Sequence, residues 1–91
     1  MTETWTVRRL VADGQARLRR SPAIDHWPAD RERRDAEALL AFALGVEDGE
    51  LDRDAPVPPR VAARFSELVR RRAGGEPVAQ IVGWTEFRGL R

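Results

Sequence analysis

The side chains with the most scope for chemistry in this sequence are a single histidine, a cluster of carboxylates and a run of arginines. His26 is the only histidine among the 91 residues, and the sequence contains no cysteine. Thiolate nucleophiles, disulfides and cysteine-based zinc sites are therefore excluded. A lone histidine in a His-Trp-Pro loop has no nucleophile at a recognisable spacing, so we interpret His26 as a surface residue without a catalytic role.

Five carboxylates between residues 47 and 54 raise the question of calcium binding. An EF-hand loop needs a glycine at its sixth position and a glutamate at its twelfth. If Asp48 is the first ligand, Gly49 comes too early and Pro59 stands at the twelfth position. The cluster is therefore predicted to be a solvated loop, and no metal site is expected.

The arginine run Arg70, Arg71 and Arg72 is followed by Gly74 and Gly75. The glycines lack the spacing, the lysine and the preceding strand of a phosphate-binding loop, so they are predicted to end a helix. The arginines fall in the last turn of that helix, where cations suit its dipole. They form either a solvated helix end or a contact with an acidic partner or RNA. No catalytic, cofactor-binding or metal-ligating residue is predicted.

The elements that must position these side chains are predicted to be helices. Apolar residues recur at helical spacing in three segments. The predicted stripes are Val7, Leu10, Val11, Gly14 and Leu18; Ala36, Leu39, Leu40, Ala43 and Leu44; and Val61, Phe65, Leu68 and Val69. A short helix from Glu76 to Ile81 follows the third stripe. The predicted fold class is all-α, a small four- to five-helix bundle with a C-terminal extended segment.

Several single residues refine this prediction. Thr6 is placed to cap the first helix, and Gly45 to end the second. Gly14 interrupts an apolar stripe, which indicates that another helix approaches closely there. Trp5 and Trp27 are predicted to be core or helix-start residues. Residues 47–53 are predicted to form a short helical turn, and residues 55–59 a stiff connector.

The end of the sequence differs from the rest, because large and polar residues alternate from Trp84 to Leu90 as they do in a strand. We therefore predict a helical domain over residues 1–83. Residues 84–91 would begin a connection to a further part of the protein. An extended segment without a partner strand is expected to be poorly ordered.

Composition sets the broad class of protein. All 16 basic residues are arginines, 15 residues are acidic, and the formal net charge is +1. This balance gives no reason to expect direct nucleic-acid binding. No apolar run approaches the length of a membrane helix, and the N-terminus lacks the pattern of a secretory signal. A cytoplasmic protein of one domain is therefore expected.

Residues 71–90, which read RRAGGEPVAQIVGWTEFRGL, resemble the end of the N-terminal domain in the HemK/PrmC family of release-factor glutamine methyltransferases. The family pattern there is approximately RRxxGEPxxYIxGxxEFxGL. Residues 35–41, with Arg64, Phe65, Leu68 and Val69, match further family motifs in the same order. The sequence departs from the family at Gln80, where tyrosine is usual, and in residues 21–33, which are longer and more charged.

The resemblance implies that this helical domain is one part of a longer protein, and that residues 84–91 begin the linker or hairpin to a missing catalytic domain, a methyltransferase. Family members join this helical domain to a second domain that binds S-adenosylmethionine and methylates the glutamine of a Gly-Gly-Gln loop in class 1 release factors. The full-length protein is implied to be an enzyme, whereas this fragment is implied to carry no cofactor site. Its implied partners are a class 1 release factor and its own catalytic domain, with Arg70, Arg71 and Arg72 as the candidate contact.

Two alternatives to this function stay open. The chain could be a free-standing helical interaction module, associated with the ribosome or RNA through its arginines, and strongly salt-dependent RNA affinity would favour that hypothesis. It could also be a structural domain that only supports its neighbour, which binding of a release factor to the isolated chain would contradict.

Overall fold

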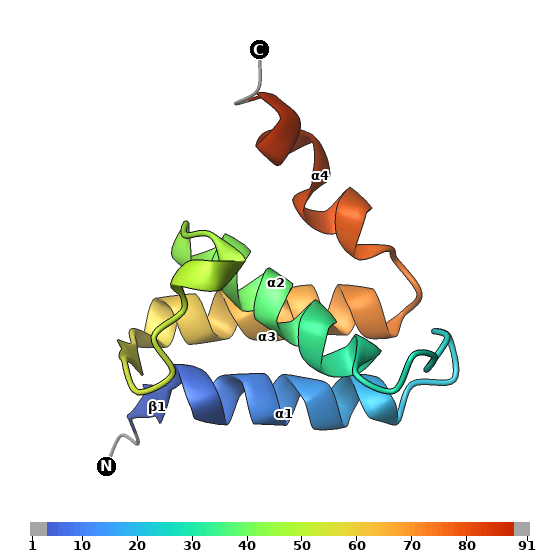
Figure 1. The fold of residues 1–91 in the computed structure, drawn as a ribbon, viewed down its shortest axis with the longest axis horizontal. Helices are drawn as coiled ribbons and strands as arrows, with labels where there is room; N and C mark the ends of the chain where they lie inside the picture. The colour runs from blue at the N-terminus through green and yellow to red at the C-terminus, as the bar shows by residue number, and fades with distance from the viewer. Residues whose placement is uncertain (1–3, 89–91) are drawn as a thin grey trace.

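Figure 1 shows the chain as a computed structural model, which describes the backbone of residues 4–88 and the side chains of residues 4–83. Within that range four α-helices dominate, so the predicted all-α fold class is confirmed. In chain order the elements are β1 (Trp5–Thr6), α1 (Val7–Arg19), α2 (Arg31–Leu44), the 3-10 turn η1 (Asp48–Glu50), β2 (Pro56–Val57), α3 (Pro59–Ala73) and α4 (Val78–Arg88).

Helix α1 begins and packs as its sequence predicts. The hydroxyl of Thr6 accepts a hydrogen bond from the backbone N–H of Arg9 at 3.2 Å, which caps the helix. Trp5 is half-buried against the core, and the Arg9 guanidinium lies 4.7 Å from the centroid of its ring. All residues of the predicted stripe are buried, namely Val7, Leu10, Val11, Gly14 and Leu18.

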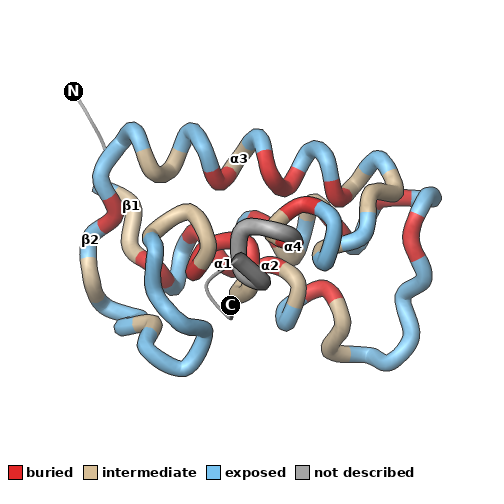
Figure 2. Tube along the Cα trace, turned by 90° about the horizontal axis from the view of Figure 1, so that it is seen from above, coloured by how far each residue is buried: buried red, intermediate tan, exposed pale blue. Residues whose placement is uncertain are grey.

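The core lies where α1, α2 and α3 face one another, and Figure 2 shows the buried residues of α3 on the side toward the other two helices. The side chains of Leu39, Leu40 and Phe65 have no exposed surface. A Cβ atom added to Gly14 would lie 2.7 Å from Cζ of Phe65, which is closer than real contacts allow. The close helix approach predicted at Gly14 is therefore confirmed, because only glycine leaves room for this ring.

The connector before α3 has a partner that the sequence does not reveal. Strand β2 pairs antiparallel with β1, with Trp5 opposite Val57 and Thr6 opposite Pro56. The backbone N–H groups of Val7 and Arg8 extend this contact by donating to the carbonyl oxygens of Ala55 and Arg53, both at 3.0 Å. The chain at the start of α1 is therefore held by backbone hydrogen bonds to the segment between η1 and α3.

The predicted end of the second helix is confirmed, whereas the predicted structure of the C-terminal segment is not. Gly45 ends α2 in the left-handed conformation, with φ of 79°, as the sequence predicts. The extended segment predicted from Trp84 is wrong for residues 84–88, whose backbone is helical in α4 beyond a break at Gly83. A lone strand has no partner for its N–H and C=O groups, whereas a helix pairs them internally. Residues 89–91 lie outside the described residues, and the assignment of residues 84–91 to a linker stays a prediction.

Candidate partner-binding surface

One end of the bundle brings together the C-termini of α1 and α3, the N-terminus of α2 and the loop between α1 and α2 (Figure 1). Ser21 fastens this loop to both helix ends. Its hydroxyl donates to the carbonyl oxygen of Ala73 at 2.6 Å, and its N–H donates to that of Leu18 at 3.0 Å. We refer to residues 19–35 and 70–76 together as the loop end, and all three arginines of the predicted contact lie in it.

Arg72 has a structural position in the loop end. It is only 7% exposed, and its Nε donates to the Asp35 carboxylate at 2.9 Å. One of its terminal nitrogens also donates to the carbonyl oxygen of Glu76 at 3.3 Å. These bonds join the end of α3 to α2 and to the chain that leads into α4. Charge-assisted hydrogen bonds shielded from water are among the stronger polar contacts in proteins, so we assign Arg72 to holding the helices together.

The other two arginines of the run remain at the surface. Arg71 makes a two-pronged contact with Glu76, in which its Nε donates to one carboxylate oxygen at 2.9 Å. This hydrogen bond raises the pKa of Arg71 and lowers that of Glu76. Arg70 lies 3.7 Å from the Glu67 carboxylate, and 73% of its side chain is exposed. Of the three, Arg70 therefore offers a partner the most accessible guanidinium.

His26 is exposed, as predicted, yet both nitrogens of its ring are engaged. Nε2 lies 2.8 Å from the carbonyl oxygen of Ser21, and Nδ1 contacts the carboxylate of Glu32. A carbonyl oxygen only accepts, so Nε2 must carry a proton. Glu32 is buried, with 2% of its surface exposed. The protonated, cationic ring therefore satisfies both acceptors at once, and it also supplies the buried carboxylate with a counter-charge.

The ionisation of the His26–Glu32 pair follows from these contacts. The hydrogen bond to Glu32, with that to the Ser21 carbonyl, raises the pKa of His26 above its ordinary 6.5. Burial raises the pKa of Glu32, but hydrogen bonds from His26 and from its own backbone N–H outweigh burial and leave the pKa below its ordinary 4.5. The folded state thus favours the charged form of both partners.

This pair predicts a pH dependence of stability. The raised pKa of His26 gives stability that is fully present below pH 6.5 and lost as pH rises through the folded value. The lowered pKa of Glu32 gives stability that is present above pH 4.5 and lost as pH falls through its folded value. The wild-type chain should therefore lose more thermal stability than His26→Gln between about pH 5.5 and pH 9. Parallel melting-temperature profiles of the two proteins would contradict the ion pair.

Trp27 is where the structure most clearly departs from the sequence-based prediction. It was predicted to be a core or helix-start residue, but it is 74% exposed. The loop that carries it is buried only at Ser21 and Ile24, so most of the indole ring is open to solvent. Glu32 was missed altogether, although it lies four residues before Ala36 on the buried stripe of α2. A carboxylate at a stripe position was the available signal for a polar partner.

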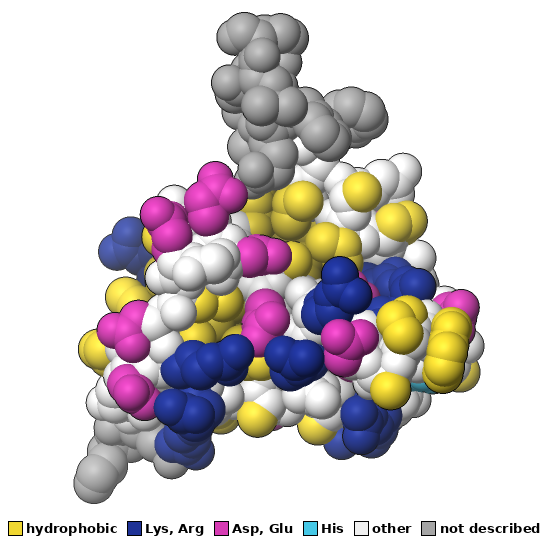
Figure 3. Space-filling model, viewed as in Figure 1, with side chains coloured by type: hydrophobic (Ala, Val, Ile, Leu, Met, Phe, Trp, Pro, Cys, Tyr) yellow, Lys and Arg dark blue, Asp and Glu magenta, His cyan; other side chains and the backbone are white. Residues whose placement is uncertain are grey.

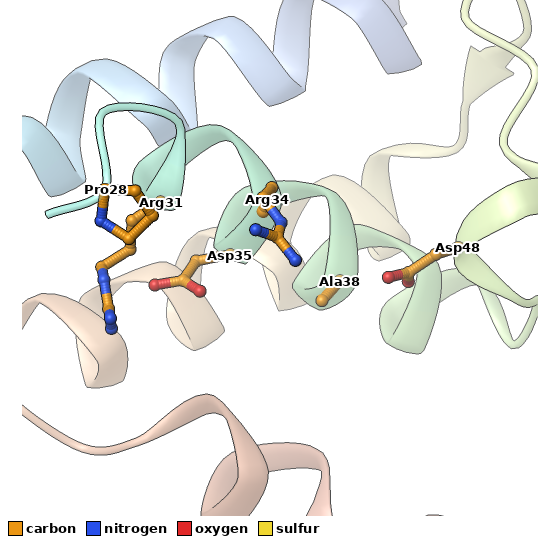
Figure 4. Close-up of a pocket in the computed structure, with 6 residues that line it drawn as sticks. All are labelled: Pro28, Arg31, Arg34, Asp35, Ala38 and Asp48. Atoms are coloured by element: carbon orange, nitrogen blue, oxygen red, sulfur yellow. The ribbon is translucent and has the colours of Figure 1, made fainter.

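Charges of both signs are interleaved on the face of the molecule that Figure 3 shows. Beside the loop lies a hollow of about 360 Å³ whose lining mixes the two signs. Figure 4 shows the residues that line it, which are Pro28, Arg31, Arg34, Asp35, Ala38 and Asp48. Within the described part of the chain, no group of three or more potential metal ligands comes together, and no helix is long and apolar enough to cross a membrane.

Comparison with known proteins identifies relatives of this chain. The chain is similar to the release factor glutamine methyltransferase of Rhodopirellula baltica, with 42% identity over 90 residues that cover 94% of the chain and 28% of that protein. The protein of the same name from Cereibacter sphaeroides is 42% identical over 64 residues, which cover 68% of the chain and 23% of that protein. The one from Burkholderia pseudomallei is 47% identical over 58 residues, or 62% of the chain and 20% of that protein.

The chain thus spans about a quarter of the length of these curated relatives. No solved structure matches it significantly. The sequence model of one family, described as the PrmC N-terminal domain, matches residues 9–83. That match runs from the first helix to the break in α4 and includes both sides of the loop end. On this evidence, together with the identity to full-length relatives, the chain belongs to the PrmC N-terminal domain family.

Proposed function

We propose that this chain is the substrate-binding domain of an S-adenosylmethionine-dependent protein-glutamine N5-methyltransferase. The observation that carries the proposal is the 42% identity to a release factor glutamine methyltransferase over nearly the whole chain. The chain spans about a quarter of such relatives, so we assign the cofactor site and methyl transfer to the remainder of the protein. The 91 residues would then bind and position, in the cytoplasm, a partner on which another domain acts.

The partner that we propose is a class 1 peptide chain release factor, modified at the glutamine of its Gly-Gly-Gln loop. One side chain on a loop offers an enzyme little surface for discrimination. A second contact far from the reacting atom supplies binding energy and restricts the orientation of the loop. A domain that presents fixed polar and apolar groups at one end suits that task. Support comes from the name of the relatives and from the hydrogen-bonded loop end.

Arg70 is the residue of the predicted arginine contact that a release factor would reach most easily. Its side chain is 73% exposed and, among the described residues, is held by a 3.7 Å pair with Glu67, whereas Arg72 is engaged within the fold. Guanidinium groups suit carboxylates on a polar protein surface, because they present several donors in a fixed plane. We therefore place Arg70, with Arg71 beside it, in the proposed contact and leave Arg72 a supporting role.

The test is a titration of the 91-residue chain with a class 1 release factor in a calorimeter. Binding is expected with a dissociation constant on the order of micromolar. Arg70→Glu should weaken it about 3- to 10-fold, because an exposed guanidinium facing carboxylates is replaced by a like charge. Arg60→Glu is the matched control, since Arg60 is exposed at the opposite end of the same helix. It should leave the affinity unchanged.

Four other outcomes would contradict the proposal or its contact. Absence of binding at millimolar concentration would remove the substrate-binding function and favour a purely structural domain. Tighter, strongly salt-dependent binding of an RNA oligonucleotide would favour the RNA-associated module. Methyl transfer from labelled S-adenosylmethionine by the isolated chain would show that it catalyses on its own. Equal effects of the two charge reversals would move the contact away from the loop end.

A further inference from the structure

Trp27 is an exposed indole in a protein that buries most of its large apolar side chains. It is 74% exposed, and Val46, at 39%, is the other exposed large hydrophobic residue among residues 4–83. Isolated exposed aliphatic residues are common on protein surfaces. Tryptophan is different, because its large flat ring is among the side chains most enriched at the energetic centres of protein interfaces. The exposed indole therefore indicates a binding partner that covers it.

The loop that carries Trp27 is fixed by hydrogen bonds on both sides of the indole. The Asp25 carboxylate accepts from the backbone N–H of Trp27 at 3.1 Å. The guanidinium of Arg31 donates to the Trp27 carbonyl oxygen at 2.8 Å. The contact of His26 with buried Glu32 closes the loop onto α2. An anchor held in this way loses little conformational freedom on binding, which favours affinity.

The groups around Trp27 indicate the chemistry of the occupant. Pro28, the residue after Trp27, lines the hollow of about 360 Å³ shown in Figure 4, together with Arg31, Arg34, Ala38 and the carboxylates of Asp35 and Asp48. The side chain of Arg34 is 67% exposed, and its pair with Asp30 is long, at 4.0 Å. An exposed indole on a segment that also exposes the Arg34 guanidinium fits a partner surface with an apolar pocket and carboxylates near it.

The charge balance favours a protein over a nucleic acid as the occupant. Residues 21–35 contain four acidic side chains and three arginines, so the segment carries no excess of positive charge. The acidic residues are Asp25, Asp30, Glu32 and Asp35. A phosphate backbone selects an unbalanced basic surface, and it would be repelled by these carboxylates. A protein surface of mixed charge with an apolar pocket is compatible with both signs.

We propose that Trp27 is the apolar anchor by which this domain docks onto a class 1 release factor, inserting into a pocket whose acidic rim faces Arg31 and Arg34. This inference rests on the proposed function and specifies its contact. The loop is positioned by Ser21, which holds it to the end of α3, so Trp27 and Arg70 belong to the same end of the molecule. One partner surface would then engage both.

The inference is tested with the same calorimetric titration of the 91-residue chain by a release factor. Trp27→Ala should weaken binding at least about 10-fold, as removal of a central aromatic anchor does. Trp27→Phe should retain most of the affinity, since it keeps an aromatic ring. Val46→Ala is the control for loss of an exposed apolar side chain outside the loop end, and it should bind like the wild type. The melting temperature of Trp27→Ala should be unchanged, because the indole is exposed in the fold.

Each result decides between distinct conclusions. If the wild type binds and Trp27→Ala binds equally well, the anchor is overturned while the proposed function stands. If the wild type does not bind a release factor, both are overturned. Sedimentation of the free chain tests a second copy as the occupant: a dimer that Trp27→Ala abolishes would assign the indole to self-association and overturn the inference. Weaker binding by Trp27→Ala with an unchanged melting temperature would support it.

Discussion

Replacing Phe65 with alanine is expected to lower the free energy of unfolding by about 3–5 kcal/mol. The ring has no exposed surface and lies in the core against Gly14 of α1, in the same cluster as Ala36 of α2. Its removal forfeits the transfer of the ring from water and leaves a cavity that rigid helices fill only in part. Small domains have total stabilities of about 5–15 kcal/mol, so this one substitution would remove much of the fold's margin.

Urea denaturation followed by circular dichroism measures the effect. Phe42→Ala is the control, because Phe42 is an aromatic residue on α2 that is only partly buried. It should cost clearly less than Phe65→Ala. If Phe65→Ala is unfolded in buffer, Phe65→Leu gives a smaller loss that is still measurable. An unchanged denaturation midpoint for both Phe65 variants would show that the ring is not part of the core.

Gly14→Val is expected to destabilise the chain by about 2–3 kcal/mol. A Cβ atom at this position would already lie 2.7 Å from Cζ of Phe65, and valine adds two methyl groups. Valine favours a helix over glycine by a few tenths of a kcal/mol, which is too little to offset the overlap. The ring of Phe65 is enclosed on all sides, so relief requires α1 and α3 to move apart.

A double-mutant cycle identifies the cause of that loss. In the Phe65→Leu background, Gly14→Val should cost less, with a coupling energy of about 0.5–3 kcal/mol. Ala12→Val is the control, because Ala12 is exposed on α1 and the change tests only the effect of a β-branched residue in this helix. Additive effects of the Gly14 and Phe65 substitutions would mean that the two residues do not meet.

The helices themselves were predictable because their signals are local. The cap at Thr6 and the helix end at Gly45 depend on residues adjacent in sequence, and periodicity marks the buried face of α1 without knowledge of its neighbours. The β1–β2 pair was not predictable. Two residues in each strand are too few for a pattern, and their pairing depends on where α1 and α3 come to lie.

The candidate surface was predictable only in part, because the consecutive residues of the arginine run lie in different environments. Successive residues of a helix point about 100° apart, so Arg70 and Arg72 face different ways. Arg72 lies seven residues after Phe65 and joins its buried stripe, where Asp35 meets it. The spacing could have shown that Arg72 is buried. The exposure of Trp27 could not have been found, because residue type alone favours burial and the loop has no periodicity.

The pairing of β1 with β2 also bears on the order of events during folding. It joins positions 5 and 57, so about 50 residues must be brought into a closed loop before either strand gains its partner. The pairing of four strand residues contributes little free energy compared with the entropy lost in closing that loop. Contacts between neighbouring helices close shorter loops, and they place the two strand segments side by side as they form. We therefore expect the strand pair to form late in folding, so that its loss would speed unfolding more than it slows folding.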